Sequence, residues 1–279
     1  MSQQSSPRDS LGAILSIEDA GALEFSARLE DFWGSALGAD AIARAALAAW
    51  RTAEGRQLHA LHACYLGPLP PGVPLRLRVE RLSDTRALAR RRVQVLDDDR
   101  LLCSVTAGFV VPGEGLSYQG ASLEPDLPRP EDLPSTLETA TAEGWADYSF
   151  GPVEFRRIGA AWPWPPAAAH ASTTHREWVR PRQPLPDDPG LRMAALVFLS
   201  DFYSHWTASD RLGTGFVPPR FQALDHAVWI HRPEPWKGWW LLEAVSDVGS
   251  GGRMFTRREL YSAAGSLIAS ASQEGLYSG

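Results

Sequence analysis

The sequence contains only two cysteines, a single lysine and no asparagine among its 279 residues. Cys64 and Cys103 lie in separate apolar segments, without a second cysteine or a histidine at metal-ligand spacing, so we expect reduced thiols and no bound metal. No apolar run approaches the roughly 20 residues that span a bilayer. The apolar patch after MSQQSSPRDS is also too short and too acidic for a signal peptide. These absences argue against a membrane protein and favour a soluble, cytoplasmic one.

Basic residues are also fewer than acidic residues, with 27 Lys and Arg against 33 Asp and Glu. The formal net charge is -6, and no long basic run interrupts the acidic background. Because proteins bind nucleic acid largely through cationic contacts with phosphates, a nucleic-acid partner is not expected. A hydrophobic content of 44% is nevertheless enough to build a substantial core. The composition therefore predicts a folded globular protein.

Hydrophobic periodicity predicts one helix and four strands in the first half of the chain. Residues 37–52 are rich in alanine, and their apolar residues recur near helical spacing, which favours a helix. Further along, Leu75, Leu77 and Val79 alternate with charged residues, as in an antiparallel strand with one face in water. The four predicted strands cover residues 58–66, 73–82, 87–96 and 101–111.

The composition changes after residue 111. Residues 112–144 are rich in proline, glutamate, glycine and serine, which predicts a linker rather than a core. Beyond them the same order of elements returns, with strand-like VEFRRIG and THREWVRP before a helix at 191–203. Four more strands are predicted at 221–231, 239–246, 252–261 and 267–276. We therefore divide the chain into an N-terminal unit (1–111), a linker (112–144) and a C-terminal unit (145–279).

The two units also match at the level of residues. LLCSVTAGF at Leu101 aligns with LIASASQEG at Leu267, an offset of 267 minus 101, or 166. Leu61-His62-Ala63 aligns with Asp225-His226-Ala227, an offset of 226 minus 62, or 164. A repeated helix with an antiparallel sheet predicts an α+β fold of the double hotdog type. In that fold two tandem repeats each wrap a long helix, and their sheets join across a pseudo-two-fold axis.

Particular motifs carry a resemblance to a known family. LHALHACYLGPLPPGVPLRLRVERLSDTRALARRRV, beginning at Leu58, resembles the N-terminal hotdog of the acyl-CoA thioesterase II (TesB-like) family. LDHAVWIHRP at Leu224 and LIASASQEG at Leu267 are similar to the family's C-terminal motifs. The match covers both units but not the linker. It implies hydrolysis of acyl-CoA thioesters without a metal or organic cofactor, in a homo-oligomer.

The resemblance also implies a site in the C-terminal unit. In the family an aspartate, a threonine or serine, and a glutamine orient and activate a water molecule. The matching aspartate and glutamine are Asp225 and Gln273. At the hydroxyl position the sequence departs from the family pattern, because the alignment places Asp247 there, with Ser246 and Ser250 nearby.

These residue types suit thioester hydrolysis. Asp225 can act as the base, and the amide of Gln273 can both donate and accept a hydrogen bond. A second carboxylate at Asp247 would raise the pKa of one member of the pair, leaving either an acid and base couple or altered chemistry. A one-residue slip would instead place Ser246 at this position. Neighbouring strand residues face opposite sides, so only one of the two alignments can serve the site.

The internal repeat separates functional from structural residues. Leu61 and Ala107 align with Asp225 and Gln273, so the polar pair exists in one copy only. This asymmetry favours an active site over a buried polar cluster, although such clusters also occur. His226 and His62 align with each other, which favours a hydrogen-bonding role in the core. The arginines at 90–92, 253, 257 and 258 either attract the phosphates of coenzyme A or form a solvated face.

Three functions therefore stay open. The first is an acyl-CoA thioesterase that uses Asp225, Gln273 and Asp247 or a neighbouring serine. The second is a hotdog dehydratase or isomerase acting on an acyl thioester, since Asp247 could remove a proton beside the carbonyl. The third is a non-catalytic protein that binds acyl thioesters. All three functions imply that the protein binds acyl-CoA or another acyl thioester.

Overall fold

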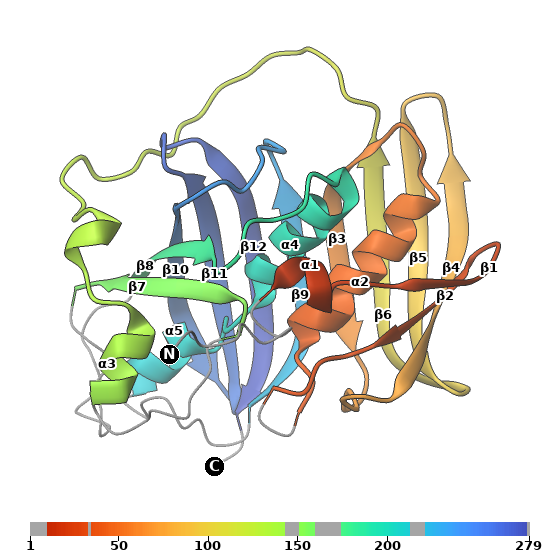
Figure 1. The fold of residues 1–279 in the computed structure, drawn as a ribbon, viewed down its shortest axis with the longest axis horizontal. Helices are drawn as coiled ribbons and strands as arrows, with labels where there is room; N and C mark the ends of the chain where they lie inside the picture. The colour runs from red at the N-terminus through yellow and green to blue at the C-terminus, as the bar shows by residue number, and fades with distance from the viewer. Residues whose placement is uncertain (1–9, 33–34, 143–150, 160–173, 213–220, 278–279) are drawn as a thin grey trace, which may run out of the picture.

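One antiparallel sheet runs through the whole molecule. The computed structural model describes residues 10–32, 35–142, 151–159, 174–212 and 221–277. Within these residues twelve strands pair in the order β1-β2-β4-β5-β6-β3-β9-β12-β11-β10-β8-β7. The sheet curves around two central helices, α2 and α4 (Figure 1). This is the arrangement expected of two hotdog repeats joined side by side.

Each half of the sheet belongs to one half of the sequence. The N-terminal half contains α1 (Leu11–Ile14), β1 (Glu18–Gly21), β2 (Glu24–Arg28), α2 (Gly38–Arg51), β3 (Gln57–Tyr65), β4 (Pro74–Asp84), β5 (Leu88–Asp97) and β6 (Arg100–Val110). The C-terminal half contains α3 (Thr136–Ala142), β7 (Val153–Ile158), β8 (Thr174–Pro181), α4 (Pro189–Asp201), α5 (Trp206–Leu212), β9 (Phe221–Ile230), β10 (Trp240–Ser250), β11 (Arg253–Ser262) and β12 (Leu267–Tyr277). The main predicted strands agree with these bounds to within a few residues.

Small residues let the two central helices approach closely. The α2 helix is buried along nearly its whole length, mainly through alanines between Ala39 and Ala49. At the start of α4, a Cβ atom on Gly190 would lie 2.6 Å from the Trp50 ring. Such a distance is a clash, so this crossing requires glycine. The close packing of α2 and α4 keeps the ends of both helices beside the strands that surround them.

The repeat predicted from the sequence is present, with one change of register. At the junction of the halves β3 pairs with β9, so that Leu61 lies opposite Val228. Leu61 pairs with Ala107 as His226 pairs with Gln273, and these side chains face the helices. The counterpart of His226 is therefore Leu61. The predicted equivalence with His62 is wrong, because His62 lies on the outer face with its ring against Trp229.

The segment predicted to be a linker is more ordered than its composition suggests. It arches from β6 to α3 (Figure 1) and packs Leu123, Leu127 and Leu133 around a satellite cluster formed by Trp178, Leu241 and Tyr261. Five short helices and strands were not predicted, namely α1, β1, β2, α3 and α5. Their short length and weak periodicity explain the omission. Among the described residues, no helix is both long enough and apolar enough to cross a membrane.

Candidate functional site

A cavity of about 960 Å³ opens where the two halves meet. Its walls come from the start of α2, the end of β3, the start of β9, the end of β12 and the segment that follows α4. Both hotdog units therefore contribute to it. The polar side chains that line it include Tyr65, Asp201, Ser204 and Gln273.

A chain of hydrogen bonds joins these polar side chains. The amide Nε2 of Gln273 donates to Oδ1 of Asp201, while its Oε1 accepts from the hydroxyl of Ser204. The Tyr65 hydroxyl donates to the other carboxylate oxygen of Asp201 over 3.2 Å. Both ends of the Gln273 amide are thus fixed, and so is its orientation. Tyr65 comes from the N-terminal unit, which makes the cluster a joint product of both units.

Asp201 reaches the cavity because α4 ends there. It is the last residue of the helix, and Tyr203, two residues on, has a φ of 54° in the left-handed region. Such a conformation is unfavourable for an aromatic residue and persists only where the surroundings enforce it. The Tyr203 ring stacks on Trp206 with centroids 3.9 Å apart. The turn directs Ser204 back towards Gln273.

Arg258 supports the end of α4 from β11. Its buried guanidinium donates to the carbonyl oxygen of Phe202 over 2.8 Å and to those of Leu199 and Ser200 over 3.4 Å each. These are carbonyl groups that a helix end leaves without intrahelical partners. A cation at this position also favours the negative end of the helix dipole. Arg258 therefore holds the residues on both sides of Asp201.

Burial controls the charge of the carboxylate. It raises the pKa of Asp201 to about 6, although Arg258, Gln273 and Tyr65 pull the pKa downwards. Burial also lowers the pKa of Arg258 to about 10, so that this side chain stays cationic at neutral pH. Asp201 thus titrates close to neutrality. A carboxylate with such a pKa is suited to take up and release a proton.

Asp201→Asn is expected to stabilise the fold at alkaline pH. The folded-state pKa lies above the ordinary value of 3.8, so the stability associated with the protonated form is lost as the pH rises through about 6. Removing the buried charge should raise the free energy of unfolding at pH 8 by on the order of 2–3 kcal/mol. The gain should be smaller by about 1 kcal/mol at pH 5. Urea unfolding of wild type and Asp201→Asn at pH 5 and pH 8 measures the gain in the free energy of unfolding. A gain that is absent at pH 8, or no larger at pH 8 than at pH 5, would contradict the prediction.

The buried histidines of the site are neutral. His226 lies with Nδ1 3.5 Å from Asp201 and Nε2 2.9 Å from the Ser200 hydroxyl. Burial and the nearby Arg258 lower the pKa of His226 to about 3, and the pKa of His205 is lowered to about 3 by the same two causes. A neutral His226 can pack against Asp201 without forming an ion pair. Its core role agrees with the interpretation made from the sequence.

The structure does not bring the three predicted site residues together. Gln273 is buried and faces the cavity, but Asp225 lies on the outer face of the sheet, where its carboxylate accepts the backbone N–H of Glu274 over 3.1 Å. This contact spans a bulge in the β9–β12 pairing. Asp225 and His226 face opposite sides of β9, and the inward one is His226. The Gln273 amide and the Asp225 carboxylate therefore do not bond to each other in this structure, and a joint role of the two residues stays a prediction.

Asp247 also lies outside the cavity. It is exposed and pairs with Arg257, 2.5 Å away, on the outer face of the sheet. Ser246, the alternative, is buried, but its hydroxyl donates to the carbonyl oxygen of Phe255 at a bulge in the β10–β11 pairing. Neither residue lines the cavity that contains Gln273. The hydroxyl group that bonds to Gln273 is that of Ser204, and a role for Asp247 or Ser246 at the hydroxyl position stays a prediction.

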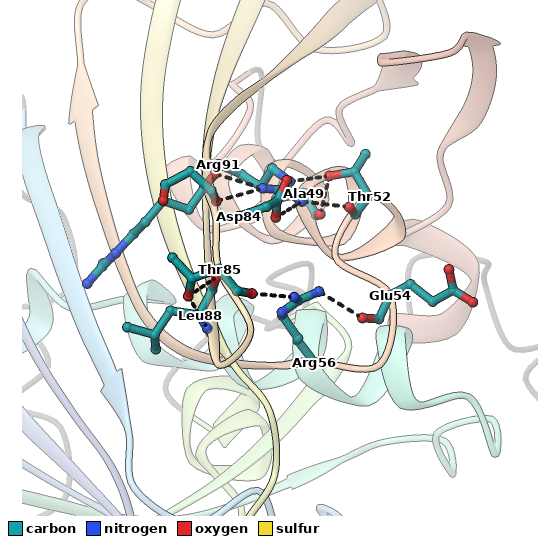
Figure 2. Close-up of polar contacts among 10 residues, drawn as sticks. Ala49, Thr52, Glu54, Arg56, Asp84, Thr85, Leu88 and Arg91 are labelled. Atoms are coloured by element: carbon teal, nitrogen blue, oxygen red, sulfur yellow. Dashed lines mark hydrogen bonds and ion pairs between the residues drawn. The ribbon is translucent and has the colours of Figure 1, made fainter.

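Five of the six arginines considered for phosphate binding, all except Arg90, form hydrogen bonds or ion pairs with other described residues. Arg92 pairs with Glu80, Arg253 with Glu274, and Arg257 with Asp247. Arg91 is buried and binds the end of α2 through the hydroxyl and carbonyl oxygens of Thr52 (Figure 2). The arginine run therefore contributes alternately to a solvated face and to the core. This alternation follows from the two-residue period of a strand.

Sequence reasoning did not identify Asp201, Ser204 and Tyr65. The sequence held one signal for Asp201. A carboxylate in the last turn of a helix interacts unfavourably with the helix dipole, so its presence there suggests a function. Ser204 and Tyr65 had no comparable signal. Their role depends on contacts across 69 and 136 residues of sequence, respectively.

Comparison with known proteins connects the fold to one family. Residues 31–111 match the model of the acyl-CoA thioesterase N-terminal domain, and residues 125–277 match that of the C-terminal domain. Acyl-CoA thioesterase 2 of Haemophilus influenzae is 28% identical over 276 residues, which cover 94% of this chain and 95% of that protein.

Solved structures agree with this result. The tesB protein of Mycobacterium avium subs paratuberculosis superimposes with a TM-score of 0.79 and 26% identity, over 96% of this chain and 98% of that one. Acyl-CoA thioesterase II TesB2 from Mycobacterium marinum gives a TM-score of 0.77 and 25% identity, with the same two coverages. The double hotdog fold expected from the sequence is confirmed.

Proposed function

The chain belongs to the acyl-CoA thioesterase family, and from this premise we propose that Asp201 and Gln273 hold the water that hydrolyses an acyl-CoA thioester. One observation carries the assignment: the Gln273 amide bridges Asp201 and Ser204 inside the cavity shared by the two units. Acyl-CoA thioester hydrolysis is the chemistry of the family. Asp201 takes the place that the sequence had suggested for Asp225.

The proposed water lies between the carboxylate and the amide. The amide nitrogen of Gln273 carries two hydrogens, of which one bonds to Asp201 and the other remains for the water oxygen. The water in turn donates a hydrogen bond to Asp201. Ser204 holds the amide oxygen and prevents the amide from rotating. This arrangement points a lone pair of the water into the cavity.

The reaction proceeds by general base catalysis. Asp201 takes a proton from the water as its oxygen bonds to the thioester carbonyl carbon. The carbon–sulfur bond then breaks, and the departing thiolate of coenzyme A takes the proton back from Asp201. The products are a free carboxylic acid and coenzyme A. Because its pKa is about 6, Asp201 is mostly ionised at neutral pH and still able to return the proton.

The start of α2 supplies donors for the negative oxygen of the intermediate. Gly38 and Ala39 line the cavity in the first turn of this helix, and no side chain caps that turn. The first N–H groups of a helix have no intrahelical acceptors and lie at the positive end of its dipole. Aimed at the carbonyl oxygen, they stabilise charge as it develops.

The proposal separates Asp201 from the residues on the outer face. Asp225→Asn and Asp247→Asn should each keep kcat/KM within about threefold of wild type, because both side chains lie outside the cavity. The measurement is thiol release from acyl-CoAs of short, long and aromatic acyl groups. Loss of turnover in Asp225→Asn alone would restore the site predicted from the sequence.

Mass spectrometry of the same reactions tests the other candidates. Isomerised or unsaturated acyl-CoA with its thioester intact would identify a dehydratase or isomerase. Saturable binding with no thiol release across the panel would identify a binding protein. Either result would overturn the hydrolytic assignment.

A homo-oligomer and a cytoplasmic location stay predictions. Trp229 and Phe255 are 41% and 36% exposed on the outer face of the sheet, and such apolar groups are common at interfaces between subunits. Sedimentation velocity of the wild-type protein tests the oligomeric state. A monomer at micromolar concentration would contradict the prediction.

A further inference from the structure

A second cavity, of about 550 Å³, lies at the opposite ends of the two central helices. It is bounded by the end of α2 with residues 53–56, the start of β3, the start of α4, the end of β9, and Pro112 after β6. Each of these elements is the pseudo-two-fold counterpart of one that bounds the first cavity. The second cavity is therefore the position that an active site would occupy in the N-terminal unit.

The groups proposed for catalysis are missing from this position. Ile230 ends β9 and lines the second cavity where Tyr65 ends β3 and lines the first. Leu58 takes the place of Ala223, and the pair Leu61 and Ala107 stands for His226 and Gln273. Among the described residues, the walls of the second cavity contain no aspartate and no counterpart of the Gln273 amide. The N-terminal unit thus retains the cavity but lacks the side chains proposed for hydrolysis.

The walls that replace them are apolar and bordered by cations. Apolar side chains include Trp50, Leu58, Met193, Leu196 and Ile230. The charged residues are three arginines and two glutamates, namely Arg51, Arg56, Arg192, Glu54 and Glu234. A volume of this size falls within the range of about 300–1,000 Å³ typical of small-molecule sites. The lining suits an apolar molecule with one anionic end.

Arg56 is the cation best placed for the anionic end. Its guanidinium donates to the carbonyl oxygens of Glu54 over 3.2 Å and of Thr85 over 2.8 Å (Figure 2). Both are neutral acceptors, and its Nε atom is buried without a partner among the described residues. Arg51 and Arg192, by contrast, pair with Asp19 and Asp187. Arg56 is therefore fixed in place and forms no ion pair among the described residues, although its charge helps to lower the pKa of Asp84.

We propose that the second cavity binds an aliphatic carboxylate, the product class of the reaction, with its chain among the apolar walls and its carboxylate at Arg56. The class of ligand rests on the proposed function, because hydrolysis releases this kind of acid beside the site. The cavity itself rests only on its geometry. Because hydrophobic residues stand at the positions that correspond to His226 and Gln273, the cluster proposed for hydrolysis is not repeated here, and a bound molecule is held and not cleaved.

The test uses dodecanoate as the probe and calorimetry on the full chain. Arg56→Gln should weaken dodecanoate binding about tenfold, since a charge-assisted hydrogen bond is lost. Met193→Glu should weaken it at least as much by placing a negative charge in the cavity. Neither residue belongs to the proposed catalytic cluster, so kcat/KM should stay within about threefold of wild type. Dodecanol serves as the matched ligand, and its affinity should be unchanged in Arg56→Gln.

Several results would overturn the proposal. Full dodecanoate affinity in both variants would place the ligand elsewhere, and binding lost in Asp201→Asn but not in Arg56→Gln would place it in the first cavity. Tight binding of dodecanoyl-CoA to Asp201→Asn, dependent on Arg56 and stronger than that of dodecanoate, would assign the cavity to the thioester instead. Failure of the proposed function is distinguishable, because it would abolish thiol release by wild type and leave the dependence of dodecanoate binding on Arg56 intact.

Discussion

Replacing Asp201 with asparagine is expected to lower kcat/KM for acyl-CoA hydrolysis by about 10³-fold, within the range of general base catalysis. The substitution keeps the shape of the side chain and one oxygen that can accept from Gln273, but removes the group that accepts the proton. Thiol release under single-turnover conditions measures the chemical step. Asp225→Asn is the matched control, because it makes the same chemical change on the outer face of the sheet.

The pH profile gives this prediction a second readout. Hydrolysis requires the ionised form of Asp201, whose pKa is about 6. Wild-type kcat/KM should therefore be level above this pH and fall about tenfold for each pH unit below it. Asp201→Asn should lose that acidic limb together with its activity. An unchanged profile in Asp201→Asn would assign the proton transfer to another group.

The double repeat could be predicted from the sequence because its evidence is local. The alternating pattern in residues 73–82 and the alanine-rich pattern at 37–52 each show which face of that segment is buried, without information from the rest of the chain. Gln273 was selected by its motif and does face the cavity. The partner of Gln273 was missed because Asp201 lies 72 residues away and contacts it only through tertiary folding.

Asp225 was chosen from a sequence motif, and its position on the outer face shows how sensitive strands are to register. Asp225 and His226 are neighbours, and a shift of one residue exchanges the inner and outer faces of β9. Aligning His226 with His62 gave a plausible repeat but the wrong face. The bulge in the β9–β12 pairing next to Asp225 is not visible in the pattern of hydrophobic residues. Small irregularities of this kind decide which polar side chain enters a site.

Removing the cation of Arg258 is expected to shift the acidic limb of the pH profile upwards. Arg258 lowers the pKa of Asp201 through its charge, so Arg258→Met should leave a smaller fraction of Asp201 ionised at pH 7. We expect kcat/KM at pH 7 to fall about tenfold or more, with partial recovery at higher pH. Arg258→Lys keeps the charge and should move the limb less, which also provides a readout if Arg258→Met folds poorly.

Arg91 supplies the control for a purely structural effect. It supports the end of α2 as Arg258 supports the end of α4, through Thr52 and an ion pair with Asp84 at 2.8 Å (Figure 2). Arg91→Met should therefore destabilise the protein, since a buried polar network is broken, while the pH at which kcat/KM declines stays unchanged. If both substitutions moved the limb equally, the effect would come from loosening of the fold. A shift confined to Arg258→Met would identify Arg258 as the positioning residue that sets the charge of Asp201.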